Sequence, residues 1–334
     1  MGDTIISSIV KYMPKVSILI PVYNRKNFIA DCIQSALNQT VTDFEVVVVD
    51  NASDDGTWGI CQQFAEKDRR VRVFRNDTNI GPVRNWLACV EKAQGEYGKL
   101  LFSDDLIFPK FLEHTLHFLE NPEVGFVSTA VSIGTSPENG KINFLLSAKE
   151  QHIPSARYFE LLLNARVPFS PGAAVFRMVD IRKNLQLSFP TRIPRDFTLN
   201  GAGPDVLLFA LTAAIYESVV MLPSSDVFFR THPDSFTTLN NDNEVEKGYR
   251  AALAWFFAEK LTRNDWVKYA ARSWLSRMQR TRTMISLTKH CSEFEGSGAV
   301  FEALIVLAAT FPIAIGEIIE SLRRANTSHE QSQF

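Results

Sequence analysis

Acidic residues stand directly after two apolar stretches of the chain. Asp50 follows the valine-rich run 44–49, and the adjacent pair Asp104 and Asp105 follows the run 99–102. Two neighbouring carboxylates repel each other unless a cation or hydrogen-bond donors offset their charge. A hard divalent cation such as Mg²⁺ or Mn²⁺, shared with the phosphates of a substrate, suits oxygen ligands of this kind. The alternative is that these residues only form turns and cap the helices that follow them.

The elements that would position these carboxylates alternate along the first part of the chain. The apolar patterns predict strands at 16–20, 44–49, 71–74, 99–102 and 124–129, and helices at 28–37, 58–65, 83–90 and 111–119. Strict alternation with short links predicts βαβ units on a largely parallel sheet. Ligands of such sheets gather at the carboxyl ends of the strands, which is where Asp50, Asp104 and Asp105 are expected.

The pattern changes after Ala130. The residues beyond it predict a hairpin or loop at 131–150, helices at 156–164 and 206–216, and short strands near 176, at 219–222 and at 226–230. From Glu244 to about Leu322 the chain is predicted to be mostly helical.

Composition and missing motifs exclude several function classes. The 334 residues carry a formal net charge of -2, so no basic surface for a nucleic-acid partner is indicated. The absence of GxGxxG after the first strand, of GxxxxGK(S/T) and of GxSxG disfavours a dinucleotide-binding dehydrogenase, a P-loop enzyme and an α/β-hydrolase. None of the four cysteines is in CxxC spacing and no signal peptide is visible, which indicates a cytoplasmic location.

Five short motifs follow one another in the first half of the chain. They are VSILIPVYN at 16–24, VVVVDNASDDGT at 46–57, NIGPVRN at 79–85, GEY at 95–97 and FSDDLI at 102–107. In this order and spacing they resemble glycosyltransferase family 2. A weaker resemblance runs through 168–176 and 205–235.

The resemblance implies an α/β protein of the GT-A fold, with a Rossmann-like, mostly parallel sheet flanked by helices. The implied catalytic domain covers residues 1–243, with a nucleotide-sugar-binding half at 1–130 and an acceptor and base half at 131–243. Residues 244–334 would form a helical C-terminal extension with a polar tail.

The resemblance also implies a site for a nucleotide sugar. The residues that would contact the donor are Pro21, Val22, Tyr23, Asn24, Asp50, Arg84, Asp104 and Arg230. Tyr23 would stack on the base, and Asp50 would accept a hydrogen bond from it. For Arg84 the alternative is a solvated helix face.

The implied cofactor is Mg²⁺ or Mn²⁺ bridging the diphosphate. Asp105 would coordinate the metal, and His232, in an Arg-x-His-x-x-Ser element that begins at Arg230, would complete the shell. A lone histidine is more often not a ligand, so both interpretations of His232 stay open. Ser103 stands where the family's Asp-x-Asp motif often has its first carboxylate.

An inverting transfer to a hydroxyl requires a base that removes the proton of the acceptor. The resemblance assigns this role to Asp205, which precedes the predicted helix 206–216. The structural alternative is that Asp205 caps that helix, and both roles can hold at once. Asp196, nine residues upstream and without a helix directly after it, is the rival candidate for the base.

The expected function is an inverting, metal-dependent glycosyltransferase. It would move a sugar from a UDP- or dTDP-linked donor to a hydroxyl of a glycan, in the synthesis of a bacterial surface polysaccharide. The alternative is a non-catalytic nucleotide-sugar-binding or scaffold subunit, which Ser103 supports. A nucleotidyltransferase is disfavoured because 21–27 is not a Gly-rich basic loop.

The C-terminal region indicates possible contact with a membrane. The apolar run 303–315 falls short of the roughly 20 residues that a membrane span needs. Basic and aromatic residues are interleaved just before it, at 255–289, as in helices that lie on anionic lipid. A peripheral location at the inner face of the cytoplasmic membrane and a lipid-linked glycan acceptor are therefore expected. The alternative is an amphipathic helix packed on the catalytic domain.

Overall fold

The computed structural model describes residues 13–191, 196–233, 235 and 242–260, together with 262, 267, 270–272, 274 and 275. The apolar run 303–315, the tail and most of the basic and aromatic region that precedes the run lie outside the described residues. Within the described residues, no helix combines the length and the apolar character that crossing a membrane would require.

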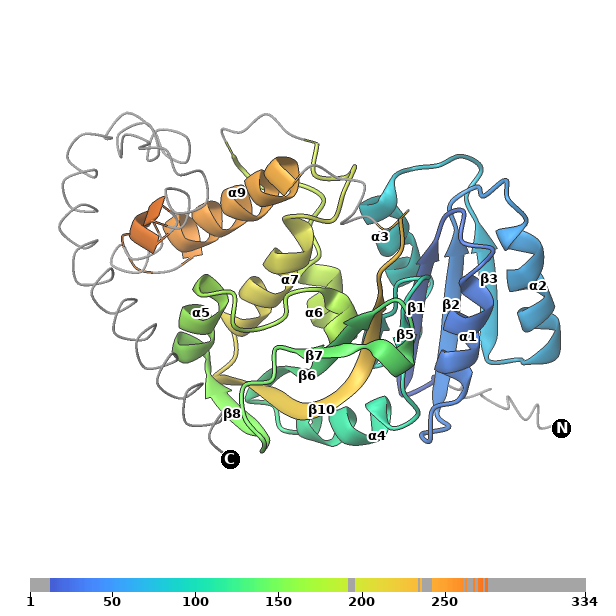
Figure 1. Cartoon of the computed structure of the whole chain (residues 1–334), viewed down its shortest axis with the longest axis horizontal. Helices are drawn as coiled ribbons and strands as arrows, with labels where there is room; N and C mark the ends of the chain where they lie inside the picture. Colours follow the sequence, from blue (N-terminus) through green and yellow to red (C-terminus); the bar gives the residue numbers. More distant parts are fainter. Residues whose placement is uncertain are drawn as a thin grey trace, which may run out of the picture.

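One sheet of ten strands forms the centre of the described part of the chain (Figure 1). The strands are β1 (Val16–Val22), β2 (Phe44–Asp50), β3 (Val71–Arg75), β4 (Tyr97–Leu100), β5 (Leu106–Ile107), β6 (Val124–Gly134), β7 (Lys141–Asn143), β8 (Gln151–Pro154), β9 (Ala174–Arg177) and β10 (Ser218–Arg230).

Helices flank this sheet. The α-helices are α1 (Ile29–Leu37), α2 (Thr57–Lys67), α3 (Pro82–Lys92), α4 (Phe111–Thr115), α5 (Ser155–Leu163), α6 (Met178–Asn184), α7 (Pro204–Ala213) and α9 (Asp242–Lys260). Short 3-10 helices are η1 (Leu116–Glu120), η2 (Pro137–Asn139) and η3 (Pro171–Ala173).

The sheet is parallel in its first half and mixed in its second. The order is β3-β2-β1-β4-β9-β6-β10-β5, with β7 on β6 and β8 on β10. Strands β3, β2, β1 and β4 are parallel neighbours, as the alternation predicts, and β6 and β10 are also parallel. Strand β9 runs antiparallel between β4 and β6. The predicted α/β class is confirmed, and parallel pairing dominates only in the first half.

Two hydrophobic cores, one on each face of the sheet, hold the helices in place. In β2, Val46 and Val48 face one core, whereas Val47 and Val49 face the other. Side chains alternate along a strand, so four consecutive valines bury both faces. One core contains the apolar faces of α3, α5, α6, α7 and α9, and the other contains those of α1 and α4. Figure 1 shows α7 and α9 together on the side of the sheet opposite α4.

Several elements differ from the sequence-based prediction. The two short strands expected at 219–222 and 226–230 are one strand, β10, whose pairing with β6 shifts in register between Leu222 and Val227. The segment 131–150 contains a hairpin, as one of the two alternatives predicted, because β7 pairs with β6 in antiparallel fashion. Strand β5 and helix α6 were not predicted.

Candidate active site

Asp50 lies at the end of β2, beside the end of β1. The parallel register pairs Val22 with Asp50, so that both strands end at the same edge of the sheet. Asp50 is fully buried; its Oδ2 lies 3.2 Å from Arg75 Nε and accepts the N–H of Ser53 at 3.2 Å. Its Oδ1 is buried without a hydrogen-bond partner in the described structure. An unsatisfied buried oxygen is costly, which fits a site for a ligand that donates a hydrogen bond.

Asn24 ties the loop after β1 to the loop after β2. Its backbone has a φ of 49°, and its N–H donates to Ser53 Oγ at 2.9 Å. Its side chain exchanges two hydrogen bonds with Asp54, at 3.0 and 3.1 Å. The neighbouring Tyr23 is 42% exposed, which leaves it accessible to a ligand. Asn24 therefore has a structural part in shaping the edge of the site.

The acidic pair meets the end of β10. Strand β5 pairs with β10 in antiparallel fashion, which places residues 230–232 beside Asp104 and Asp105. The Arg230 N–H donates to Asp105 Oδ1 at 2.9 Å, and Arg230 Nε donates to the Asp104 carbonyl at 3.0 Å. His232 Nε2 lies 3.0 Å from Asp104 Oδ2. Two segments that are far apart in sequence thus form one polar cluster, Asp104–Asp105–Arg230–His232.

A buried lysine lies beneath this cluster. Lys99, on β4, is fully buried; its Nζ donates to the carbonyl of Gly172 and lies 4.3 Å from the ring centre of Phe111. Burial lowers the pKa of Lys99 to about 7, although the charge of Asp105 opposes this shift. Burial and the charge of Asp104 raise the pKa of Asp105 well above its usual value.

The donor set of the cluster fits a divalent cation shared with phosphates. No group of three or more His, Cys, Asp or Glu residues within the described ranges is arranged to hold a metal by itself. Mg²⁺, however, is usually held by one or two carboxylates together with substrate phosphates and water. The positive charges of Lys99 and Arg230 only partly offset the effect of burial and of Asp104 on the pKa of Asp105, so a bound cation would further stabilise the ionised carboxylate. His232 Nδ1 is buried without a hydrogen-bond partner in the described part of the chain.

Arg84 contacts a different part of the molecule. It lies on α3, and its Nη1 donates to Thr198 Oγ1 at 2.7 Å. Thr198 in turn donates its hydroxyl to Asp196 Oδ1 at 2.6 Å. The exposed Asp196 carboxylate accepts hydrogen bonds from Thr198, which lower its pKa. Arg84 and Asp196 therefore belong to one surface network.

Asp205 lies at the start of α7. Gly203 has a φ of 125°, a conformation that favours glycine, and the chain turns there into Pro204 and the helix. Asp205 Oδ1 accepts the N–H of Gly203 at 2.9 Å and that of Val206 at 2.7 Å. Its Oδ2 accepts the hydroxyl of Tyr249 at 2.8 Å. Burial raises the pKa of Asp205 to about 7, although these hydrogen bonds oppose the shift.

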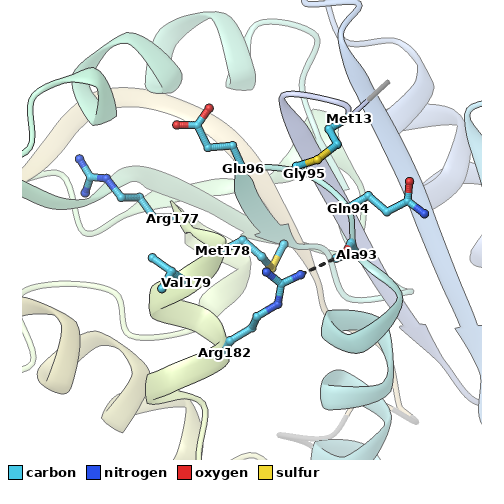
Figure 2. Close-up of a pocket in the computed structure, with 9 residues that line it drawn as sticks. All are labelled: Met13, Ala93, Gln94, Gly95, Glu96, Arg177, Met178, Val179 and Arg182. Atoms are coloured by element: carbon cyan, nitrogen blue, oxygen red, sulfur yellow. Dashed lines mark hydrogen bonds between the residues drawn. The ribbon is translucent and has the colours of Figure 1, made fainter. Parts of the chain in front are cut away.

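A cavity of about 560 Å³ lies at the other edge of the sheet, near the amino ends of β1 and β4 (Figure 2). Its lining residues are Met13, Ala93, Gln94, Gly95, Glu96, Arg177, Met178, Val179 and Arg182. Parallel strands bind ligands at their carboxyl ends, so this cavity lies away from the candidate active site.

Sequence reasoning missed four polar residues near the predicted ones: Arg25, Arg75, Lys99 and Tyr249. Arg25 Nε lies 3.7 Å from Asp104 Oδ2. The register of β2 and β3 pairs Asp50 with Arg75, so the predicted strands could have indicated this partner. Lys99 and Tyr249 depend on contacts between distant segments, which no local pattern signals.

The sequence of this chain matches a known protein family. The sequence profile described as Glycosyl transferase family 2 matches residues 17–183. The chain belongs to glycosyltransferase family 2. Asp50, Arg84, Asp104 and Asp105 lie within the matched segment, whereas Asp205 and its hydrogen-bond partner Tyr249 lie beyond it.

Curated relatives match about a third of this chain. A glycosyltransferase of Haemophilus influenzae, described as uncharacterized, is 39% identical over 107 residues, which are 32% of this chain and 43% of that protein. Chondroitin synthase of Escherichia coli is 39% identical over 112 residues, 33% of this chain and 16% of that protein. The chain therefore spans less than half the length of each of these two relatives.

A similar fold over most of the chain is found in the crystal structure of S. aureus TarS residues 1–349 in complex with UDP-GlcNAc. The TM-score is 0.58 at 14% identity, over 90% of this chain and 92% of the TarS chain. At this identity the likeness shows a shared fold. It confirms the expected GT-A architecture, including the part that follows the profile match.

Proposed function

We propose that this chain is an inverting, metal-dependent glycosyltransferase that moves a sugar from a nucleoside diphosphate to a hydroxyl of a glycan. The observation that carries the proposal is the cluster Asp104–Asp105–Arg230–His232, next to the edge where Asp50 ends β2. Membership of family 2 and the fold shared with TarS, which was crystallised with UDP-GlcNAc, support it. A UDP-sugar is the proposed donor, and a dTDP-sugar is the main alternative.

The edge formed by β1 and β2 is the proposed site for the nucleobase of the donor. The unpartnered Oδ1 of Asp50 can accept the imide N–H that uracil and thymine share. The exposed Tyr23 ring can stack on the base, and Pro21 and Val22 would line it. Asp104 would hold the ribose or the sugar.

The polar cluster is the proposed site for the diphosphate. Asp105 and His232 would hold Mg²⁺ or Mn²⁺, and Arg230 would add positive charge beside the phosphates. When bound, the metal supplies a Lewis acid that stabilises the departing diphosphate. Arg84 remains a proposed contact of the nucleotide, and its hydrogen bond to Thr198 lends that role no support.

Asp205 is the proposed base. In the transfer step, the acceptor oxygen bonds to the anomeric carbon, the bond from that carbon to the phosphate oxygen breaks, and the hydroxyl proton passes to Asp205. A pKa of about 7 suits a general base at neutral pH. The lowered pKa of Asp196 makes that carboxylate the weaker base.

The test is transfer with a panel of nucleotide sugars, with Mn²⁺ or Mg²⁺ present and then chelated. We expect Asp105→Asn to abolish binding of the nucleoside diphosphate in calorimetry. We expect Asp205→Asn to bind the donor normally and to lower kcat by roughly 10²- to 10⁴-fold, the usual contribution of a general base. Full activity in chelator would contradict the metal role. Donor binding without transfer to any acceptor would favour the non-catalytic binding subunit.

For the acceptor we propose only a chemical class. The location and the domain division are proposed as well. The proposed acceptor is a glycan or a lipid-linked glycan of a bacterial surface polysaccharide, a class consistent with the similarity to chondroitin synthase. The proposed location is cytoplasmic, with peripheral contact at the inner face of the membrane. The division into a catalytic domain at 1–243 and an extension at 244–334 stays a prediction, and α9 packs on α7 in the shared core.

A further inference from the structure

The two carboxylate oxygens of Asp205 have different kinds of partners. Oδ1 accepts two N–H groups of its own loop and helix, those of Gly203 and Val206. Oδ2 accepts the hydroxyl of Tyr249, which lies 44 residues further along the chain on α9. A carboxylate oxygen has room for about two hydrogen bonds. Oδ1 is therefore saturated, and Oδ2 is the oxygen that retains capacity to receive a proton.

Helix α9 is held closely against the loop that carries Asp205. A Cβ added at Gly248 would lie 2.4 Å from the carbonyl oxygen of Ala202, so glycine permits an approach that a larger residue would prevent. The ring of the next residue, Tyr249, packs edge-on against Phe169, with ring centres 4.8 Å apart. These two contacts fix the Tyr249 hydroxyl over Oδ2 of Asp205.

We propose that Tyr249 is a positioning residue for Asp205, and that helix α9 thereby completes the catalytic centre of a transferase whose profile match ends at residue 183. The inference rests on the proposed function of Asp205 as the base. The Tyr249 hydroxyl orients Oδ2 and leaves one of its lone pairs for the acceptor. When the acceptor O–H bond breaks and Oδ2 gains the proton, Tyr249 keeps its own proton.

The polar surroundings of Asp205 make this contact measurable. After burial, the main influences on its pKa are hydrogen bonds, including that from Tyr249, which lowers it. None of the described charged side chains of α9 is among those main influences, whether close to Tyr249 in sequence (Glu246, Lys247 and Arg250) or at the end of the helix (Glu259 and Lys260), and neither is Asp196 in the preceding loop. Removal of the Tyr249 hydroxyl is therefore expected to raise the pKa of Asp205 further.

The experiment compares Tyr249→Phe with Tyr216→Phe in the full-length chain. Both variants remove one tyrosine hydroxyl that donates to an aspartate, because Tyr216 donates to Asp180 Oδ2 at 2.9 Å. We expect Tyr249→Phe to lower kcat at pH 7 by about tenfold, the usual effect of losing a hydrogen bond to a charged group. The KM for the donor should be unchanged, and the acid limb of the pH profile of kcat should move to higher pH. Tyr216→Phe should change none of these.

A second variant guards against loss of folding. Replacement of Tyr249 by 3-fluorotyrosine keeps the ring contacts and makes the hydroxyl a stronger donor, so the acid limb should move to lower pH. An unchanged kcat and an unmoved acid limb in both Tyr249 variants would overturn the inference. If Asp205→Asn itself retains full transfer, the base assignment fails instead, which separates failure of the proposed function from failure of this inference.

Discussion

Burial changes the protonation of Asp205 between the unfolded and the folded chain. Its pKa in the folded protein is about 7, against a usual value of 3.8 for an exposed aspartate. Between these two values the folded protein holds a proton that the unfolded chain has released. The stability that this group contributes is therefore full below about pH 4 and is lost as the pH rises through 7.

The first prediction concerns Asp205→Asn. The asparagine does not titrate. As the pH rises from 4 to 8, the unfolding free energy of the wild type should therefore fall relative to that of the variant. One pKa unit corresponds to about 1.4 kcal/mol, so the expected change is of the order of 2 to 4 kcal/mol. Urea unfolding at several pH values measures it. A difference that stays flat across this range would show that Asp205 is not held protonated.

Helix α9 is the element whose packing most directly affects the candidate base. Gly248 faces the backbone of Ala202, and Phe256 and Phe257 of the same helix pack against Phe159 of α5. The helix thus connects the loop before α7 with α5 in one core. Any change that moves α9 outward is expected to disturb Asp205 as well.

The second prediction tests this connection with Gly248→Ala. The new Cβ would clash with the Ala202 carbonyl, so we expect a loss of about 1 to 3 kcal/mol of stability together with reduced kcat. Gly59→Ala on α2 is the matched control, because its added Cβ meets nothing within 4 Å. That control should be neutral or slightly stabilising, since alanine favours helices by up to about 1 kcal/mol. Thermal unfolding of both variants measures the loss of stability. An equal loss in the two variants would contradict the prediction.

Local sequence patterns predicted most helices and strands of the first half of the chain. They failed where pairing between distant segments determines the secondary structure. The four valines of β2 predicted a strand buried on both faces, and this is confirmed. Pro223 and two serines, Ser224 and Ser225, interrupt the apolar pattern of β10, so one strand was predicted as two. Its continuity depends on pairing with β6, which is a tertiary contact.

Prediction of the candidate site has the same limit. Asp50, Asp104 and Asp105 were predicted at strand ends; Asp50 is the last residue of β2, whereas Asp104 and Asp105 lie in the turn between β4 and β5. The contact of Asp104 with His232 depends on the pairing of β5 with β10. Only the family resemblance, and no local pattern, could bring those residues together in advance. The Tyr249 contact lies beyond even that resemblance.

At the scale of the whole molecule, the proposed donor site draws on both halves of the sheet. The proposed nucleobase site lies at β1 and β2, in the parallel half. The acidic cluster lies where β5 meets β10, in the mixed half. Helix α7, which carries Asp205, packs on β6 in that second half, and α9 packs on α7. A lipid-linked acceptor would have to reach this part of the molecule from a membrane.

The third prediction concerns that membrane. Because basic and aromatic residues are interleaved at 255–289, we expect the full-length chain to co-sediment with vesicles rich in phosphatidylglycerol. Binding should be weak to phosphatidylcholine vesicles and should fall at high salt, because screening weakens exposed charges. Equal binding to both lipids, or none to either, would favour the alternative that the region packs against protein.

The strand order also has a consequence for how the chain acquires its structure. Strand β4 gains its second neighbour, β9, only after β6 has been synthesised, and the partner of β5 in β10 lies more than 100 residues downstream. Such non-local pairings slow folding and leave strand edges open in the meantime. Because the acidic cluster depends on such a pairing, we expect it to be one of the last parts of the molecule to form.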